Sequence, residues 1–262
     1  MNRVFMSITC AELSSLGRID YASLSQGALM ELLIADINNK EEICEDTEEM
    51  GDLENWEGID INDNGEVVDI DWSAYELEGE IALEWLPPTT RLAYLGENKL
   101  IGSINLSALP ASMTKLDVSE NRLSGGIDLV HLPSTLTNLE LGANALSGSL
   151  NLTKLPDNLI EIWLNTNAFQ GTVDLTQLPE TLQMLGLYEN KLSGPVDLTK
   201  LPSGMANLGL QKNGFSGSTD FSKLPDTLRD LALSDTQISG ETVFVEGKYR
   251  DIRNTNVKLI KE

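Results

Sequence analysis

The chain has 262 residues and a formal net charge of −23 at pH 7. The charge is uneven, because residues 1–89 contain 22 acidic against three basic residues, whereas residues 90–262 contain 19 against 15. No stretch reaches the roughly 18 apolar residues of a membrane-spanning helix. No basic stripe is present to neutralise nucleic-acid phosphates. We therefore expect neither a membrane span nor nucleic acid as a partner.

Two cysteines, Cys10 and Cys44, are too few for a disulfide framework or a metal cluster. We expect both to be free thiols, which favours a reducing compartment such as the cytoplasm but leaves the localisation open. The N-terminal residues MNRVFMSITCA contain one arginine and an apolar patch that is too short for an ordinary signal peptide.

The first element with a clear pattern lies over residues 23–39, SLSQGALMELLIADINN. Ser25 is a suitable N-cap, and the pair Asn38 and Asn39 is a suitable stop. The sequence therefore predicts a helix here, followed by a solvated loop over the charged run KEEICEDTEEMGDLE. The apolar residues of the helix recur near helical spacing, at Leu24, Leu29, Leu32, Leu33 and Ile37.

Residues 55–72, NWEGIDINDNGEVVDIDW, favour a β-hairpin with Asn64-Gly65 as a type I′ turn. The same letters nearly spell a calcium-binding loop of the EF-hand type, with aspartate in place of the usual glutamate at its twelfth position. An EF-hand needs flanking helices, whereas these flanks alternate like strands, so calcium is the lesser alternative to a capping hairpin. Its candidate ligands are Asp60, Asn62, Asn64, Glu66 and Asp71.

From residue 86 onward the chain repeats itself every 23 residues. Residues 132–154 read LPSTLTNLELGANALSGSLNLTK, and residues 155–177 read LPDNLIEIWLNTNAFQGTVDLTQ. The dipeptide Leu-Pro keeps this step, beginning at Leu86, Leu109, Leu132, Leu155, Leu178, Leu201 and Leu224. Asparagines keep it at Asn98, Asn121, Asn144, Asn167, Asn190 and Asn213. Glycines keep it at Gly79, Gly102, Gly125, Gly148, Gly171, Gly194, Gly217 and Gly240.

Each period has the form L-x-x-L-x-L-x-x-N-x-L, which is typical of a leucine-rich repeat solenoid. Leucines two residues apart, such as Leu139 and Leu141, point the same way on a strand, into the coil. Stacked coils then place these strands side by side, about 4.8 Å apart, in a parallel sheet. Each interior leucine is expected to meet its copies in the neighbouring coils, so the coils are stable only as a stack.

The other fixed letters predict how each coil turns. The asparagine is expected to bond backbone groups of its own coil and of the next, because its amide both donates and accepts. The glycine four residues later suits a tight bend or a positive φ. The segment from that glycine to Leu-Pro, as in GTVDLTQLP, alternates like a second short strand. We therefore expect little helix on the outer side of the coils.

The stretches LGANALSGSL and LYENKLSGPV are similar to the plant-type leucine-rich repeat family, and the resemblance covers about residues 56–240. It implies an α/β leucine-rich-repeat solenoid of the horseshoe class, with a parallel sheet on the concave face, a mostly non-helical convex face and an N-terminal helical cap. The 23-residue period resembles that of protist leucine-rich repeat proteins. Plant-type caps carry two cysteines where this chain has Glu54 and Ile61, so the disulfide of that cap is missing here.

These patterns predict three parts. An acidic N-terminal cap, made of the helix and the hairpin, covers residues 1–72. The 23-residue repeats cover residues 73–240. Residues 241–262 form an irregular last coil that caps the C-terminus, with Phe244, Ile252 and Leu259 kept in phase by a one-residue deletion.

Residues between the interior leucines of each strand are expected to face the concave surface. Aromatic anchors commonly dominate protein interfaces, and an outward tryptophan in the middle of a sheet is unusual. Ordinary surface variation is the alternative explanation. The candidate partner-binding residues are therefore Trp163, Tyr188, Met184, Glu140, Glu161, Asp117 and Tyr94.

A column of Asx residues is expected on the convex side. It suggests either cation binding or a local role, in which each side chain bonds the backbone two residues on, and the local role is favoured. The column comprises Asn105, Asp128, Asn151, Asp174, Asp197 and Asp220.

The chain has one histidine, His131, and no nucleophile elbow, phosphate loop or metal cluster. We therefore expect no catalysis and no cofactor. The sequence predicts a non-catalytic module that binds a protein partner on its concave face, as a monomer or as a subunit of a larger assembly. A structural or cell-surface adhesive solenoid, with or without calcium dependence, is the alternative.

Overall fold

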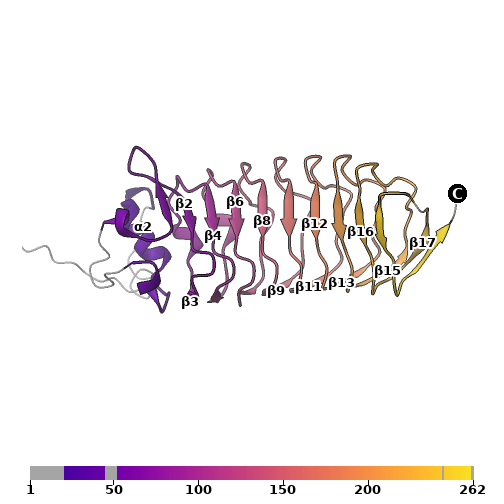
Figure 1. Cartoon of the computed structure of the whole chain (residues 1–262), viewed down its shortest axis with the longest axis horizontal. Coiled ribbons are helices and arrows are strands. Elements are labelled where there is room, and N and C mark those ends of the chain that lie inside the picture. The colour runs from indigo at the N-terminus through magenta and orange to yellow at the C-terminus, as the bar shows by residue number, and fades with distance from the viewer. Residues whose placement is uncertain (1–20, 45–51, 244, 261–262) are drawn as a thin grey trace, which may run out of the picture.

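The computed structural model describes residues 21–44, 52–243 and 245–260. They form an elongated solenoid whose coils follow one another along the long axis, with the helix α2 (Gln26–Leu33) at one end (Figure 1). The larger sheet has ten strands, in the order β1 (Ile59–Ile61), β2 (Val67–Asp71), β4 (Leu92–Tyr94), β6 (Lys115–Asp117), β8 (Asn138–Glu140), β10 (Glu161–Trp163), β12 (Met184–Gly186), β14 (Asn207–Gly209), β16 (Asp230–Ala232) and β18 (Tyr249–Asp251).

A second sheet of seven strands runs along another side of the coils. Its strands are β7 (Ser124–Gly125), β9 (Ala145–Gly148), β11 (Ala168–Gly171), β13 (Lys191–Gly194), β15 (Gly214–Ser218), β17 (Gln237–Val243) and β19 (Asn256–Ile260). The first two coils contribute a separate pair, β3 (Glu78–Glu80) and β5 (Lys99–Ile101). Short 3-10 turns complete the chain, at Tyr21–Ser23, Lys40–Glu42, Leu53–Asn55, Leu83–Trp85 and Leu106–Ala108.

The ten-stranded sheet keeps the predicted 23-residue step from β2 to β16. Leu139 on β8 pairs with Leu116 on β6 and with Ile162 on β10, and all three side chains are buried. Each therefore packs between its copies, and burial stabilises each side chain by about 1.5–3 kcal/mol before ordering entropy is subtracted. The register confirms the predicted parallel solenoid, which begins with β1 antiparallel to β2.

The repeated asparagine bonds two coils together. The amide nitrogen of Asn167 donates to the carbonyls of Leu164 and Asn165 in its own coil and of Leu141 in the preceding one. Its oxygen accepts from the backbone N–H of Leu146, also in the preceding coil, at 2.9 Å. The predicted double role is confirmed, but the neighbour is the preceding coil rather than the next one.

In the middle coils the second strand ends at the repeated glycine instead of following it as predicted, whereas β15 and β17 run past Gly217 and Gly240. β9 ends at Gly148, where φ is +91°, and β11 ends at Gly171, where φ is +87°. The positive φ predicted for this glycine is confirmed, and it turns the chain out of the sheet. An Asx turn follows at once, so the segment that alternates in sequence forms no strand. The outer side has little helix, and α2 is the only α-helix in the described ranges.

The N-terminal helix begins as predicted but ends early. The Ser25 side chain accepts from the backbone N–H of Ala28, as an N-cap does. The helix stops at Leu33 rather than at the asparagine pair, because the following residues bond the edge strand β3 instead. The backbone N–H of Asn38 donates to the Glu78 carbonyl. This tertiary pairing overrides the helical spacing of the apolar residues.

Residues 59–71 form the predicted hairpin, but its turn is not of type I′. That turn needs positive φ at both central residues, whereas Gly65 has φ +77° and Asn64 is not in the left-handed region. The Gly65 amide donates to the Asn62 carbonyl, and the Asn62 side-chain oxygen accepts from the amides of Asn64 and Glu66. The Asn62 side chain therefore moves the turn one position towards the N-terminus.

The last coil is shorter than expected. Leu231 pairs with Arg250, a step of 19, so four residues are deleted rather than one. Ile252 packs against the core as predicted, but Leu259 is 49% exposed and Val257 takes the buried position. Phe244 lies outside the described residues. The Arg250 guanidinium replaces an interior leucine and donates to backbone carbonyls of Leu228, Arg229 and Tyr249, which gives the end of the stack a polar cover.

Cys44 is buried, with its thiol 3.5 Å from the Lys40 carbonyl oxygen, whereas Cys10 lies outside the described residues. Among the helices that the structure describes, none is long and apolar enough to cross a membrane.

Candidate protein-recognition surface

The outward side of the ten-stranded sheet is here called the sheet face. From β2 to β16, each strand presents to it one residue that lies between two buried ones. Lateral pairing places four of the predicted residues in a single row across β4, β6, β8 and β10. We call this set the central row: Tyr94, Asp117, Glu140 and Trp163. All four are half-buried, and the acidic pair lies between the two aromatic residues. Tyr94 is therefore the other end of the row.

Trp163 lies flat against the next strand. The residue beside it on β12 is Gly186, and a Cβ added there would lie only 2.3 Å from Trp163 Cε3. Tyr188 rests in the same way, with its Cδ1 3.1 Å from the Cβ position of Gly209. Both aromatic rings thus lean along the sheet over a glycine, which fixes their position at little cost in side-chain entropy.

The polar atoms of these rings have no partner in the described part of the chain. No hydrogen bond within it involves the Trp163 indole N–H or the Tyr188 hydroxyl. Burial, with a smaller contribution from Glu189, raises the pKa of Tyr188, so the hydroxyl stays protonated. Two hydrogen-bond donors at the sheet face therefore have no acceptor among the described residues.

The carboxylates of the central row differ in their partners. Asp117 accepts from the Ser119 amide at 2.8 Å and from the Ser119 hydroxyl at 2.6 Å. Glu140 and its neighbour Glu161 form no hydrogen bond or ion pair with any described residue. Burial, followed by the charges of Asp117 and Glu161, raises the pKa of Glu140, and only Lys115 opposes this shift. The centre of the sheet face thus holds uncompensated negative charge.

The remaining candidates lie beside the central row. Met184 pairs with Glu161 in the adjacent row, and Tyr188 lies two residues beyond Gly186, where β12 ends. The structure thus brings Trp163, Met184 and Tyr188 onto two neighbouring coils. The 23-residue step places Gly186 directly after Trp163 in the row, but periodicity alone does not predict that the ring lies over this glycine.

The calcium-loop candidates lie on the hairpin of β1 and β2, which joins two strands rather than two helices. The Asn62 oxygen is used by backbone amides, and its nitrogen donates to the Glu66 carboxylate at 2.9 Å. Within the described residues, no group of three or more His, Cys, Asp or Glu side chains is placed to hold a metal ion. Calcium binding stays a prediction that this geometry does not favour.

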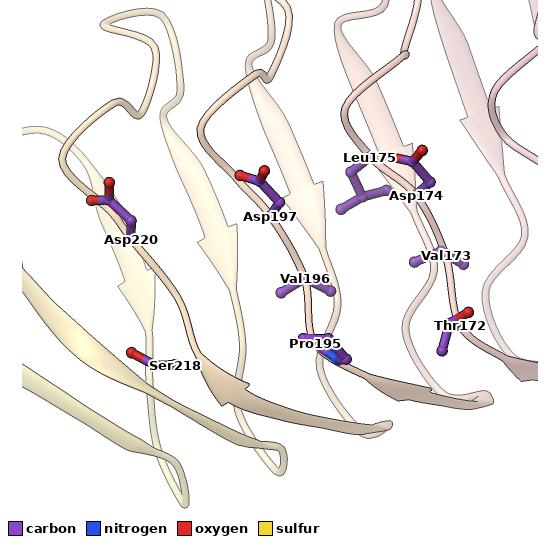
Figure 2. A pocket seen from close by; sticks show the side chains of 9 residues that line it. All are labelled: Thr172, Val173, Asp174, Leu175, Pro195, Val196, Asp197, Ser218 and Asp220. Atoms are coloured by element: carbon purple, nitrogen blue, oxygen red, sulfur yellow. The ribbon is translucent and has the colours of Figure 1, made fainter.

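The Asx column lines an open groove of about 550 Å³, in which Asp174, Asp197 and Asp220 come from three consecutive coils (Figure 2). Asp174 accepts from the amide of Thr176 at 2.8 Å and from its hydroxyl at 2.7 Å. These bonds lower the pKa of Asp174, and the same arrangement recurs at Asp197. The favoured local role of the column is confirmed, since each carboxylate holds its own corner.

Comparison with solved structures identifies the fold. The leucine-rich repeat ectodomain of the plant membrane receptor kinase GASSHO1/SCHENGEN3 from Arabidopsis thaliana, solved with Casparian strip integrity factor 2, is 20% identical and superposes with a TM-score of 0.62 over 89% of this chain. YopM from Yersinia enterocolitica is 24% identical, with a TM-score of 0.50 over 71% of this chain. This chain spans 33% of the receptor ectodomain and 42% of YopM.

No family model matches the sequence, and no curated protein matches it. The identities to solved structures establish the fold alone. Together with the 23-residue register and the asparagine ladder, by which we mean the hydrogen bonds of the repeated asparagines between coils, they show that the fold is a leucine-rich repeat solenoid.

Proposed function

We propose that this chain is a non-catalytic recognition module that binds a protein partner on the sheet face, with Trp163 as the anchor. The observation that carries the proposal is the seat of Trp163 on Gly186, in the middle of a rigid parallel sheet. A large aromatic ring held in place, with an unused N–H donor, is the kind of residue that supplies most of the binding energy at interfaces.

The surroundings support the same proposal. Met184 and Tyr188 extend the apolar surface, while Glu140 and Glu161 border it with charge, so an apolar centre has a polar rim. Leucine-rich repeat solenoids of known structure include a receptor kinase ectodomain solved in complex with Casparian strip integrity factor 2. The groove with the Asx column is a weaker candidate, because its carboxylates are engaged by their own corners.

The test is affinity purification from cell extract, with wild type, Trp163→Ala and Tyr249→Ala as baits. Tyr249 is a matched control, since it is an aromatic residue on the same sheet but at the outer edge strand β18, and is 57% exposed. We expect partners held by wild type and by Tyr249→Ala to be lost with Trp163→Ala, while the three baits have the same circular dichroism. Partners retained equally by Trp163→Ala would contradict the sheet face as the binding surface.

A further inference from the structure

We propose that the partner segment is an extended, lysine- or arginine-containing stretch of a protein, which crosses the strands along the central row with a cationic side chain between Asp117, Glu140 and Trp163. This inference rests on the proposed function and adds the chemistry of the partner. It is carried by the order of groups in the row and by the distribution of charge over the sheet face.

The order of groups in the central row suits a cation. Two carboxylates lie side by side on β6 and β8, and an aromatic ring lies at each end. Three strand spacings of about 4.8 Å separate Tyr94 from Trp163, or roughly 14 Å in all. Lysine and arginine are attracted both by carboxylates and by the face of an aromatic ring. Because Trp163 leans towards Gly186 on β12, its ring lies on the side away from Glu140, which is on β8.

The charge of the sheet face extends this site towards the N-terminal end. On β1 and β2, Asp60 pairs directly with Asp69, so both carboxylates face the same side. Asp71 pairs with Tyr94 and continues the central row. Like charges opposite each other destabilise a sheet, so this half of the face is arranged at a cost in stability. Between β1 and β10 the acidic residues of the face are Asp60, Asp69, Asp71, Asp117, Glu140 and Glu161, against Arg91 and Lys115.

Several of these carboxylates have no cation of their own. Arg91 contacts Asp69 at 3.5 Å, but only through one oxygen, and the other oxygen of Asp69 is buried without a partner. Glu140 and Glu161 form no ion pair within the described ranges. Beyond Trp163 the face carries fewer charges, with Met184, Asn207 and Gln211 before Asp230 on β16. An acidic segment would be repelled by this surface, and an uncharged one would leave its charge uncompensated.

The dimensions set the length of the segment. Four strand spacings separate β2 from β10, or about 19 Å. An extended chain covers about 3.3 Å per residue, so roughly six residues of the partner would span the acidic half. The indole N–H of Trp163 would then meet a backbone carbonyl of the same segment.

The test uses random dodecapeptides displayed on phage, selected on the wild-type chain and counter-selected on Trp163→Ala. Enriched peptides are synthesised, and their Kd is measured by fluorescence polarisation on two double variants. Glu140→Gln with Glu161→Gln removes two charges from the sheet face. Asp174→Asn with Asp197→Asn removes two charges from the groove, where asparagine occurs naturally at Asn105 and Asn151.

We expect enriched peptides to contain lysine or arginine and to bind the sheet-face variant about tenfold more weakly, with little change for the groove variant. Peptides that depend on Trp163 but lack basic residues would overturn this inference and leave the proposed function standing. Basic peptides bound equally by both double variants would also overturn it, because they would report only the overall charge. Failure to select any peptide that depends on Trp163 would overturn the proposed function itself.

Discussion

The interior of a coil and its sheet face are built from alternating residues of one strand, yet they follow opposite rules. On β10, Ile162 and the following Leu164 are fully buried, and each packs against its copies in the neighbouring coils. Glu161 and Trp163 alternate with them and face outward. An interior residue is fixed because its neighbour is itself, one coil away, whereas an outward residue can differ in every coil without cost to the stack.

The two regions therefore carry different information. The interior specifies the fold and reads the same in each coil. The sheet face specifies what is bound, and its most unusual residue, Trp163, occurs in one coil only. Comparing substitutions at paired interior and outward positions of the same coil tests this division.

The largest expected effect comes from the aromatic residue inside that coil. Phe169 is fully buried, so Phe169→Ala should lower the free energy of unfolding by about 3–5 kcal/mol, through lost burial and the cavity left behind. Trp163→Ala in the same coil should lower it by about 1 kcal/mol or less, because the ring lies on the surface. Urea unfolding followed by circular dichroism measures both. Equal losses would mean that Trp163 is part of the core rather than a binding residue.

The next effect concerns the asparagine ladder. Asn167→Leu would leave the Leu146 N–H and the Leu141 carbonyl without their side-chain partner, which should cost about 2–4 kcal/mol. Asn165→Leu, two residues earlier on the sheet face, is the matched control and should change stability by less than about 0.5 kcal/mol. Hydrogen exchange adds a local readout, since the Leu146 amide should exchange faster only in Asn167→Leu. Unchanged protection there would show that the bond is dispensable.

A smaller and opposite effect is expected where a repeated bond is missing. In most coils a hydroxyl near Leu-Pro donates to carbonyls of the preceding coil, as Thr181 does to Asp157 at 2.7 Å and Leu159 at 2.8 Å. Gly204 occupies this position in the next coil and has room for a side chain, with its Cβ position 3.9 Å from the Glu180 carbonyl. Gly204→Thr should therefore raise stability by about 1 kcal/mol, through the new bond and a less flexible unfolded chain.

Gly148→Thr is the control for that substitution. It also has space for a side chain, but its φ of +91° is unfavourable for threonine, so the same change should be destabilising. Thermal unfolding of the two variants should move in opposite directions. A loss of stability in Gly204→Thr would show that the hydroxyl bond does not form there.

Most of the interior could be predicted from the sequence, because its rules are local and repeated many times. The leucine spacing, the asparagine and the glycine each recur at a step of 23, so the structure of one coil predicts that of the next. The second strand was misplaced because alternation in GTVDLTQLP looks the same whether it comes from sheet pairing or from an Asx turn. Only the positive φ of Gly171 and the carboxylate of Asp174 distinguish the two.

The ends of the chain were harder to predict for a physical reason. There each residue meets a different neighbour instead of its own copy. The helix ends at Leu33 because Asn38 bonds Glu78 on β3, 40 positions away. The last coil is four residues shorter, and Arg250 occupies the position that leucine has in the other coils. The sequence of the earlier coils does not predict this change. The division at residues 72 and 240 stays a prediction.

The sheet face was easier to predict than the ends of the chain and harder to predict than the interior of the coils. The step of 23 predicts that Asp117, Glu140 and Trp163 share a row, and lateral pairing confirms this and adds Tyr94 to the row. The direction in which a side chain leans does not follow from periodicity. Trp163 could lean over either neighbour, and it lies over Gly186 because a glycine leaves room for the ring. The role of these residues in binding stays a proposal.

The smallest expected effect concerns Glu140, a residue of the sheet face whose charge also affects the stability of the fold. Burial and two neighbouring carboxylates raise its pKa above the ordinary value of 4.5, so the folded chain holds this proton more tightly than the unfolded chain does. Ionisation therefore costs stability above the folded pKa, and the cost disappears as the pH falls below 4.5. Glu140→Gln should raise the free energy of unfolding at pH 7 by a few tenths of a kcal/mol, after screening by solvent. Thermal unfolding between pH 4 and pH 7 measures the difference from wild type.

Asp251 gives the contrasting sign and completes this test. The Arg253 guanidinium, which donates from Nε at 2.8 Å and from Nη2 at 2.7 Å, lowers the pKa of Asp251 to about 2. The contribution of ionised Asp251 to stability is present above pH 3.8, the ordinary pKa of aspartate, and is lost as the pH falls through about 2. Asp251→Asn should therefore destabilise the chain at pH 7. A residue that serves only the fold is expected to behave like Asp251. If Glu140→Gln is instead destabilising at pH 7, the Glu140 carboxylate stabilises the fold as that of Asp251 does. That result would contradict the proposal that its charge serves to bind a partner.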